Sequence, residues 1–303
     1  MNRIVQYGSV EAIPYYNCSR KTFSEWEATG VKKPWFGYPL IAFGVFIELL
    51  YIPIIYIIIK TKLIKHPCYK IIIMLAMIDM SATCCSCLIT GPLLVIGSVF
   101  CMYPTFTYIT GGLTLNTWCM ACAATVSLFI NRIISIGFRE YADVVEKKLA
   151  YSSIAFVLFY GFYIFYFTPS LAYNSDIMAW LPDPLSEETP SKEAAAMGIN
   201  ITVQKHNPSV EQLDIRDMYV CTVLCVLHDG QAVGKGTKVK GFESAPWILA
   251  FGQICWACNH ACPAIIYVTM NDTIRREFYR LVFRVHVAPK VEDTTSAKST
   301  SKI

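Results

Sequence analysis

Apolar residues in this sequence fall into long unbroken blocks, and these blocks predict the elements of the fold. A helix needs about 20 apolar residues to cross the ~30 Å hydrocarbon core of a bilayer. Strands of a membrane barrel would instead alternate apolar and polar residues over about 10 positions. Because lipid offers no partners to backbone polar groups, blocks of this length must be helices. We predict an all-α membrane protein with five clear spans, over residues 38–59, 71–96, 105–134, 150–173 and 246–270.

The composition supports this prediction and excludes other classes. Apolar residues make up 54% of the 303 residues and charged residues 16%, whereas a soluble domain carries about 25% charged residues. The mean hydropathy is +0.43. A soluble enzyme, a disordered chain and a nucleic-acid-binding domain are therefore excluded, and we expect no nucleic acid partner.

Residues 185–245 differ from the rest of the chain. They are rich in charge, and their best apolar run is Met218–Leu227. Ten helical residues extend about 15 Å, half of a membrane. Either this run does not cross the bilayer, or two poor segments cross together and bring the five clear spans to seven.

Lys and Arg set the orientation, because short loops rich in these residues stay in the cytosol. Residues 60–70 and 132–150 carry four basic residues each, and residues 271–303 carry seven. We therefore predict an extracellular tail over 1–37, a helix bundle over 38–270 and a cytoplasmic end over 271–303, in the plasma membrane. The tail has no apolar stretch typical of a signal peptide, so the first span is expected to direct insertion.

The segment after the last span predicts a basic amphipathic helix. Arg275, Arg276, Arg280 and Arg284 lie on the side opposite its apolar residues. Such a helix lies on the inner leaflet and binds membrane lipid. The apolar positions are Ile274, Phe278, Leu281, Val282 and Val285.

The predicted outer side carries two kinds of modification signal. Asn17 and Asn200 each begin an N-x-[ST] triplet on that side, so both are candidate glycosylation sites. Most cysteines lie inside spans, where they pack as small apolar residues. Cys18 and Cys101 fall outside, in an oxidising compartment, and we hypothesise a disulfide between them.

Two acidic residues lie inside predicted spans. Asp79, in an L-A-x-x-D string, follows the cytosolic start of its helix by nine residues, about 13 Å. A carboxylate at that depth is costly and is by default a functional hypothesis. We assign Asp79 and Glu48 to an intramembrane polar switch; a protonated Asp79 that only bonds a neighbouring helix is the alternative.

The third span ends in Asn131-Arg132-x-x-x-Ile136, which resembles the D-R-Y-x-x-I string of rhodopsin-like G-protein-coupled receptors. An Arg at the inner boundary is alone explained by snorkelling, but its combination with the L-A-x-x-D string is more specific. The resemblance implies that Asn131, Arg132 and Ile136 take part in G-protein coupling. Asn131 replaces the acidic neighbour of the string.

Three residues of the third span are candidates for contact with a ligand. Thr114 precedes Arg132 by 18 residues, five turns, and lies on the same face about 27 Å further out. Trp118 and Thr125 fall near the same stripe. Ordinary helix packing explains any one of them equally well.

The residues together resemble a nematode serpentine chemoreceptor of class T. This resemblance implies a seven-helix G-protein-coupled receptor that detects an environmental chemical in the cilium of a sensory neuron, as in olfaction, and signals to a heterotrimeric G protein. It covers roughly residues 15–184 and 246–285. Residues 185–245 do not resemble the fifth and sixth helices of the family, so either this part is lost or an exon is misread, and coupling would be impaired. The strings that carry the resemblance are Tyr16-Asn17-Cys18-Ser19, His66-Pro67-Cys68-Tyr69-Lys70, Phe100-Cys101, Asn131-Arg132, Trp180-Leu181-Pro182-Asp183-Pro184, Pro263-Ala264-Ile265-Ile266-Tyr267 and Asn271-Asp272-Thr273-Ile274-Arg275.

Other classes of membrane protein fit less well. A small transporter or channel is the main alternative, but internal repeats and paired broken helices, which transporters tend to have, are not visible. No nucleophile–base pair is placed on the spans, so we expect no enzyme. Cys255, Cys258, His260 and Cys262 have metal-like spacing, but they fall in a lipid-embedded helix without a carboxylate, and we expect neither a metal nor a cofactor.

Overall fold

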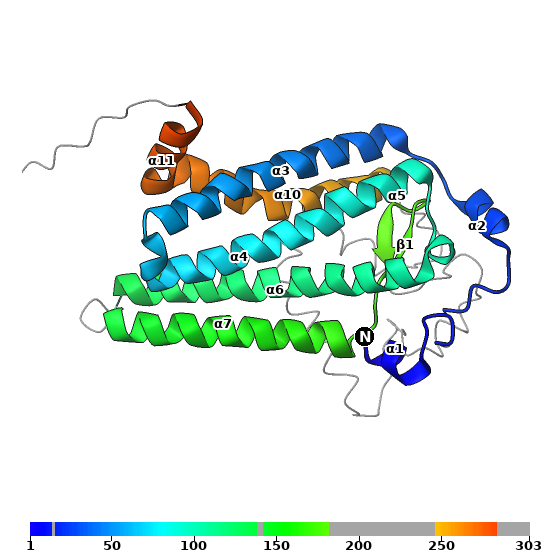
Figure 1. Ribbon diagram of the computed structural model, residues 1–303, viewed down its shortest axis with the longest axis horizontal. Coiled ribbons are helices and arrows are strands. Elements are labelled where there is room, and N and C mark those ends of the chain that lie inside the picture. The colour runs from blue at the N-terminus through cyan, green and yellow to red at the C-terminus, as the bar shows by residue number, and fades with distance from the viewer. Residues whose placement is uncertain (14–15, 138–141, 182–245, 284–303) are drawn as a thin grey trace, which may run out of the picture.

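The computed structural model describes residues 1–13, 16–137, 142–181 and 246–283, and this part of the chain is mostly helical (Figure 1). Residues 185–245, and with them Asn200 and the run at 218–227, lie outside the described residues. The long helices are α3 (Pro34–Lys60), α4 (Pro67–Thr83), α6 (Pro104–Gly137), α7 (Ala142–Phe167) and α10 (Pro246–Met270). The shorter elements are α1 (Asn2–Tyr7), α2 (Phe23–Thr29), η1 (Leu63–Lys65), η2 (Cys84–Ile89), α5 (Thr90–Ile96), η3 (Phe100–Met102), α11 (Asp272–Phe283), β1 (Ala172–Asn174) and β2 (Ala179–Leu181).

Four helical segments of the described chain are long and apolar enough to cross a membrane. They are Pro34–Lys60, Pro67–Ile96, Pro104–Ser135 and Val145–Phe167, and they run side by side along the long axis (Figure 1). Helix α10 has 25 residues and packs against α3 and α4. It carries the polar residues Gln253, Asn259 and His260 within its apolar sequence.

The second membrane segment contains a π-helical turn. Helix α4 continues through η2 into α5, and the Thr90 hydroxyl donates to the Cys85 carbonyl oxygen at 2.7 Å inside that turn. Small residues let α3 approach it closely, as is common between membrane helices. A Cβ built on Gly37 would lie 2.7 Å from the Gly91 carbonyl oxygen. π turns are frequent at functional sites.

The fourth helix differs from its predicted bounds at both ends. It begins at Ala142 rather than residue 150, and it ends at Phe167 rather than residue 173. Pro169 follows two residues later and cannot donate the backbone hydrogen bond that would continue the helix. The chain instead forms an antiparallel hairpin of β1 and β2, in which Tyr173 pairs with Trp180.

The N-terminal tail folds over one end of the bundle. Cys18 is disulfide-bonded to Cys101, with 5.4 Å between their Cα atoms. The Trp26 indole donates to the Cys18 carbonyl at 3.0 Å, and the Tyr16 ring packs edge-on against Phe100 and Tyr108. We call this end, with the hairpin, the outer cap.

Helix α11 lies at the opposite end of the molecule (Figure 1). Ile274 is buried against α3, and the Asn271 side chain accepts from the Ile274 N–H at 3.1 Å and so caps the helix start. Arg276 and Arg280 are exposed. The amphipathic pattern of the sequence is therefore realised as a helix with one face on the bundle.

Candidate functional site

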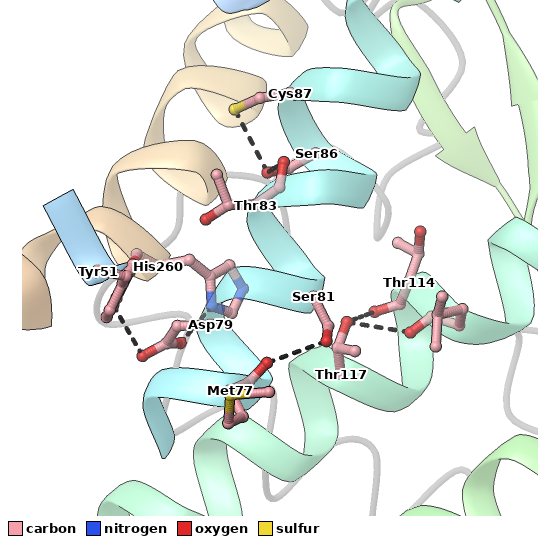
Figure 2. A network of polar contacts seen from close by, with 11 residues as sticks. Tyr51, Met77, Asp79, Ser81, Thr83, Ser86, Cys87, Thr114, Thr117 and His260 are labelled. Atoms are coloured by element: carbon pink, nitrogen blue, oxygen red, sulfur yellow. Dashed lines mark hydrogen bonds and ion pairs between the residues drawn. The ribbon is translucent and has the colours of Figure 1, made fainter. Parts of the chain in front are cut away.

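Three side chains from three helices meet in the middle of the bundle. Asp79 of α4 bonds His260 of α10, with 2.8 Å between Oδ1 and Nδ1, and the Tyr51 hydroxyl of α3 lies 3.2 Å from Asp79 Oδ2 (Figure 2). The same hydroxyl lies 2.8 Å from the His260 carbonyl oxygen. Asp79 is 2% exposed, and His260 and Tyr51 are fully buried. We call these three residues the polar junction.

Local sequence explains why the three side chains can meet. Ala257 and Ala264 share the inward face of α10 with His260, because they lie three and four positions from it, and the adjacent Ala261 is also buried. Their small side chains bring the α10 backbone close enough for Tyr51 to reach the His260 carbonyl. Asp79 likewise shares the buried face of α4 with Leu75, Ala76, Ala82 and Thr83, which lie three or four positions from it.

The junction links helices through hydrogen bonds that lipid cannot replace. A buried carboxylate is costly unless it is paired and hydrogen-bonded, and Asp79 has a partner on each oxygen. The ring nitrogen of His260 and the Asp79 carboxylate form a hydrogen bond of 2.8 Å, whose donor depends on the tautomer of the ring. The chemistry available to the site is therefore the making and breaking of interhelical hydrogen bonds.

Polar groups continue from the junction toward the outer cap along the same helices. Gln253 Nε2 donates to the Ser86 carbonyl at 2.9 Å, and the Ser86 hydroxyl lies 3.4 Å from the Thr83 carbonyl. Figure 2 shows Thr114 and Thr117 of α6 across from this row. Thr117 donates to carbonyls of its own helix at 3.0 and 3.2 Å.

The hairpin covers the outer end of this row. Tyr173 and Trp180 pack together, with ring centroids 5.1 Å apart, in a cluster that includes Trp256. The Trp180 indole donates to the Thr90 hydroxyl at 3.0 Å. Lys33 donates to the backbone carbonyls of Ser175 and Asp176, and burial lowers the pKa of its amine.

The inner end of α6 carries the Asn131-Arg132 pair. Asn131 is buried, and its Nδ2 donates to the Glu146 carbonyl of α7 at 3.3 Å. The Ser135 hydroxyl lies 3.4 Å from the Glu146 carboxylate. Arg132 is exposed, and its charge acts on Tyr267 of α10. The side chain of Ile136 lies outside the described residues.

The structure brings together some of the sequence candidates and separates others. Thr114 is buried and Trp118 half-buried on the inward side of α6, whereas Thr125 is exposed and faces away. Glu48 lies apart from Asp79: it is half-buried on α3, and its charge acts on Cys84 and Cys87. Glu48 and Asp79 therefore lie in different parts of the bundle, and their assignment to an intramembrane polar switch stays a prediction.

Asn17 is exposed, and its side-chain oxygen accepts from the Ser19 N–H at 2.8 Å. A glycan at this position would meet no buried surface. Among the described residues, no group of three or more His, Cys, Asp or Glu side chains is placed to hold a metal ion.

The sequence did not indicate which residues bond Asp79. His260 stands out only for its spacing to cysteines, and Tyr51 carries no signal of a polar role. Gln253 and Glu146, which bond other residues of the bundle, were not predicted as site residues either. One signal was available, since a histidine inside an apolar block must find a polar partner. Which helix supplies that partner depends on packing, which the sequence does not show.

Comparisons with known proteins identify a family that this sequence matches. The family described as serpentine type 7TM GPCR chemoreceptor Srt matches residues 3–220 and 206–290. The chain is 27% identical over 268 residues to serpentine receptor class T-55 of Caenorhabditis elegans, a match that covers 84% of this chain and 68% of that one. No solved structure matches. The family match also includes residues 185–245, beyond the range over which the sequence motifs carried the resemblance.

Proposed function

This chain belongs to the Srt family of serpentine seven-transmembrane chemoreceptors coupled to G proteins, and we propose that it detects an environmental chemical at its outer half and signals to a heterotrimeric G protein at its inner end. It is a receptor and not an enzyme. Detection by smell, in the cilium of a sensory neuron, is part of the proposal.

The polar junction is the observation that carries this proposal. Asp79, His260 and Tyr51 join α4, α10 and α3 near mid-membrane. A ligand shifts a receptor between states only if it binds one state better than the other. The bond between His260 and Asp79 favours the arrangement of α4 and α10 seen in this structure. A ligand that displaces α10 would stretch this bond and so shift the receptor toward another arrangement.

The inner end is suited to couple this change to a G protein. Arg132 is exposed, and its charge acts on Tyr267, which lies on the same helix as His260. Asn131 is held by Glu146 of α7 rather than by Arg132. Arg132 is therefore free of the restraint that an acidic neighbour would impose, and we expect measurable basal activity.

We propose that the outer cap faces the exterior of the plasma membrane. The cap contains the disulfide, which persists in an oxidising compartment, and the exposed Asn17 as a candidate glycosylation site. The opposite end carries Lys60, Lys62 and Lys65, as cytosolic loops do. The exposed arginines of α11 would then contact anionic lipid of the inner leaflet.

Nucleotide exchange on a heterotrimeric G protein tests the proposal. We expect cell membranes that contain the receptor to accelerate exchange over control membranes, and a panel of volatile compounds to raise it further. Arg132→Ala should remove the increase, whereas Lys148→Ala, an exposed cation on α7, should keep it. Equal exchange with and without the receptor would contradict the proposal.

Coupling is expected to be weak. Residues 185–245 contain a single apolar run of ten residues, so we expect slower exchange than with a receptor that has full fifth and sixth helices.

The rival function, a small transporter or channel, predicts current across a reconstituted bilayer. Robust conduction with no G-protein response would favour that rival.

A further inference from the structure

Five buried polar atoms beneath the hairpin find no hydrogen-bond partner among the described residues. They belong to four different elements: α4, α6, β1 and α10. Thr83, Tyr173, Gln253 and His260 are each 1% exposed or less. Since buried polar atoms are nearly always bonded, a group of exceptions calls for an explanation. The atoms are Thr83 Oγ1, Trp118 Nε1, Tyr173 Oη, Gln253 Oε1 and His260 Nε2.

Contacts of these residues and their neighbours link four of the five side chains beneath the hairpin. Gln253 uses its Nε2 on the Ser86 carbonyl, one turn from Thr83, which leaves its Oε1 without a partner. Trp256, one turn after Gln253, belongs to the apolar cluster that contains Tyr173 and against which Trp118 packs. Figure 2 shows Thr83 between the polar junction and Ser86.

The five atoms define what a ligand must offer. The Trp118 indole is a donor only and Gln253 Oε1 an acceptor only, whereas the Thr83 and Tyr173 hydroxyls serve as either. A matching group must therefore both donate and accept, as a hydroxyl or a primary amide does. An ether or a ketone accepts only and leaves Gln253 unmatched. The surrounding rings of Tyr173, Trp180 and Trp256 suit an apolar body.

The charged groups nearby are hydrogen-bonded or lie to one side. Asp79 is bonded to His260 and Tyr51, and Lys33 donates to backbone carbonyls of the hairpin. Glu48 Oε1 also has no partner within the described part of the chain, but this residue belongs to α3, is half-buried and lies toward Cys84 and Cys87. A buried ion without a counter-charge is costly, so the site favours an uncharged ligand.

We propose that this receptor recognises a small neutral molecule that carries a hydroxyl or primary amide on an apolar body, held beneath the hairpin by Thr83, Trp118, Tyr173 and Gln253. The inference rests on the proposed function and specifies the chemical class of its ligand. His260 Nε2 lies at the inner limit of the same set, so the ligand binds next to the polar junction.

A matched six-carbon series tests the ligand class on the purified receptor in nanodiscs. The probes are 1-hexanol, hexanamide, hexyl methyl ether, hexanoate and hexylammonium, and the readout is the thermal shift of the receptor as a function of probe concentration. We expect 1-hexanol and hexanamide to bind at least tenfold more tightly than the ether and the two ions. Tighter binding of either ion, or no shift with any neutral probe, would overturn the proposal.

Two variants test the residues. Thr83→Val removes an unpartnered hydroxyl and keeps the side-chain shape, so the ligand-free variant should unfold at the wild-type temperature or higher. Trp118→Phe removes the unpartnered indole N–H and with it part of the packed ring, so its binding is compared at equal amounts of folded receptor. Both should weaken 1-hexanol binding at least tenfold, while Ser81→Ala, an exposed residue of α4, should not. Wild-type affinity in both variants would overturn the assignment. Because binding is read without a G protein, a receptor that binds 1-hexanol without driving exchange would contradict the proposed function alone.

Discussion

Tyr51 shows how much a single hydroxyl contributes to this bundle. Its oxygen lies between Asp79 Oδ2 and the His260 carbonyl, and the residue is fully buried. Removal of one partner leaves a buried acceptor unsatisfied, which costs more than the bond itself contributed. The hydroxyl therefore stabilises two interhelical contacts at once.

We expect Tyr51→Phe to lower the free energy of unfolding by about 1–3 kcal/mol, since the ring remains and the bonds are lost. Thermal unfolding in detergent measures the effect. Tyr56→Phe is the matched control, because Tyr56 lies on the same helix with an exposed side chain, and its change should stay within about 0.5 kcal/mol. Equal unfolding temperatures for the two variants would contradict a structural role for the Tyr51 hydroxyl.

The sequence identified one member of the polar junction and missed the others for a physical reason. Asp79 stands out because a carboxylate in an apolar block is rare. Tyr51 does not, since it is one of 18 tyrosines in the chain. Glu48 gives the same signal as Asp79 but is half-buried on α3 and does not join the polar junction, because the partners of a side chain depend on how the helices pack.

At the scale of elements, apolar blocks predicted the existence of the helices better than their ends. Helix α7 illustrates the limit. Apolar and aromatic residues continue to Tyr173, but the helical backbone ends at Phe167. Pro169 was the local signal for that end. The hairpin that follows is held by contacts with α5 and with Val31, just before α3, which no local pattern shows.

Glycine at position 111 lets β1 approach α6. A Cβ built there would collide with the Leu171 backbone, so the strand or the helix would have to move. We expect Gly111→Ala to destabilise the receptor by about 1–3 kcal/mol, as overpacking does, measured by thermal unfolding. Gly137→Ala is the control on the same helix, because a Cβ there meets no atom within 4 Å; a destabilisation as large as that of Gly111→Ala would refute the packing argument.

The disulfide ties the tail to the bundle across a sequence separation of 83 residues. Closure of a loop of this length stabilises a fold by about 2–4 kcal/mol. We expect Cys18→Ser to lower the unfolding temperature and to abolish the response to ligand, because the outer cap loses its anchor. Cys262→Ser removes an exposed free cysteine and should leave both unchanged. An unaltered response in Cys18→Ser would count against a role of the cap in recognition.

At the scale of the whole molecule, the polar junction lies between the outer cap at one end and the end of α6 that carries Arg132 at the other. Unpartnered polar groups lie beneath the hairpin, and the inner end carries the exposed Arg132. The polar junction lies between them and bonds three helices. Composition predicted the membrane class, and the orientation given by charge bias stays a prediction. The connection between the two ends appears only when the helices are packed.

A double-mutant cycle on the Asp79–His260 pair tests the central claim most directly. Ligand-stimulated nucleotide exchange is measured for the wild type, Asp79→Asn, His260→Asn and the double variant, each normalised to the amount of folded receptor. Because the two residues act as one unit, each single variant should lose most of the stimulated exchange and the double variant should lose little more. Losses that simply add, or stimulated exchange at the wild-type level in either single variant, would contradict the account.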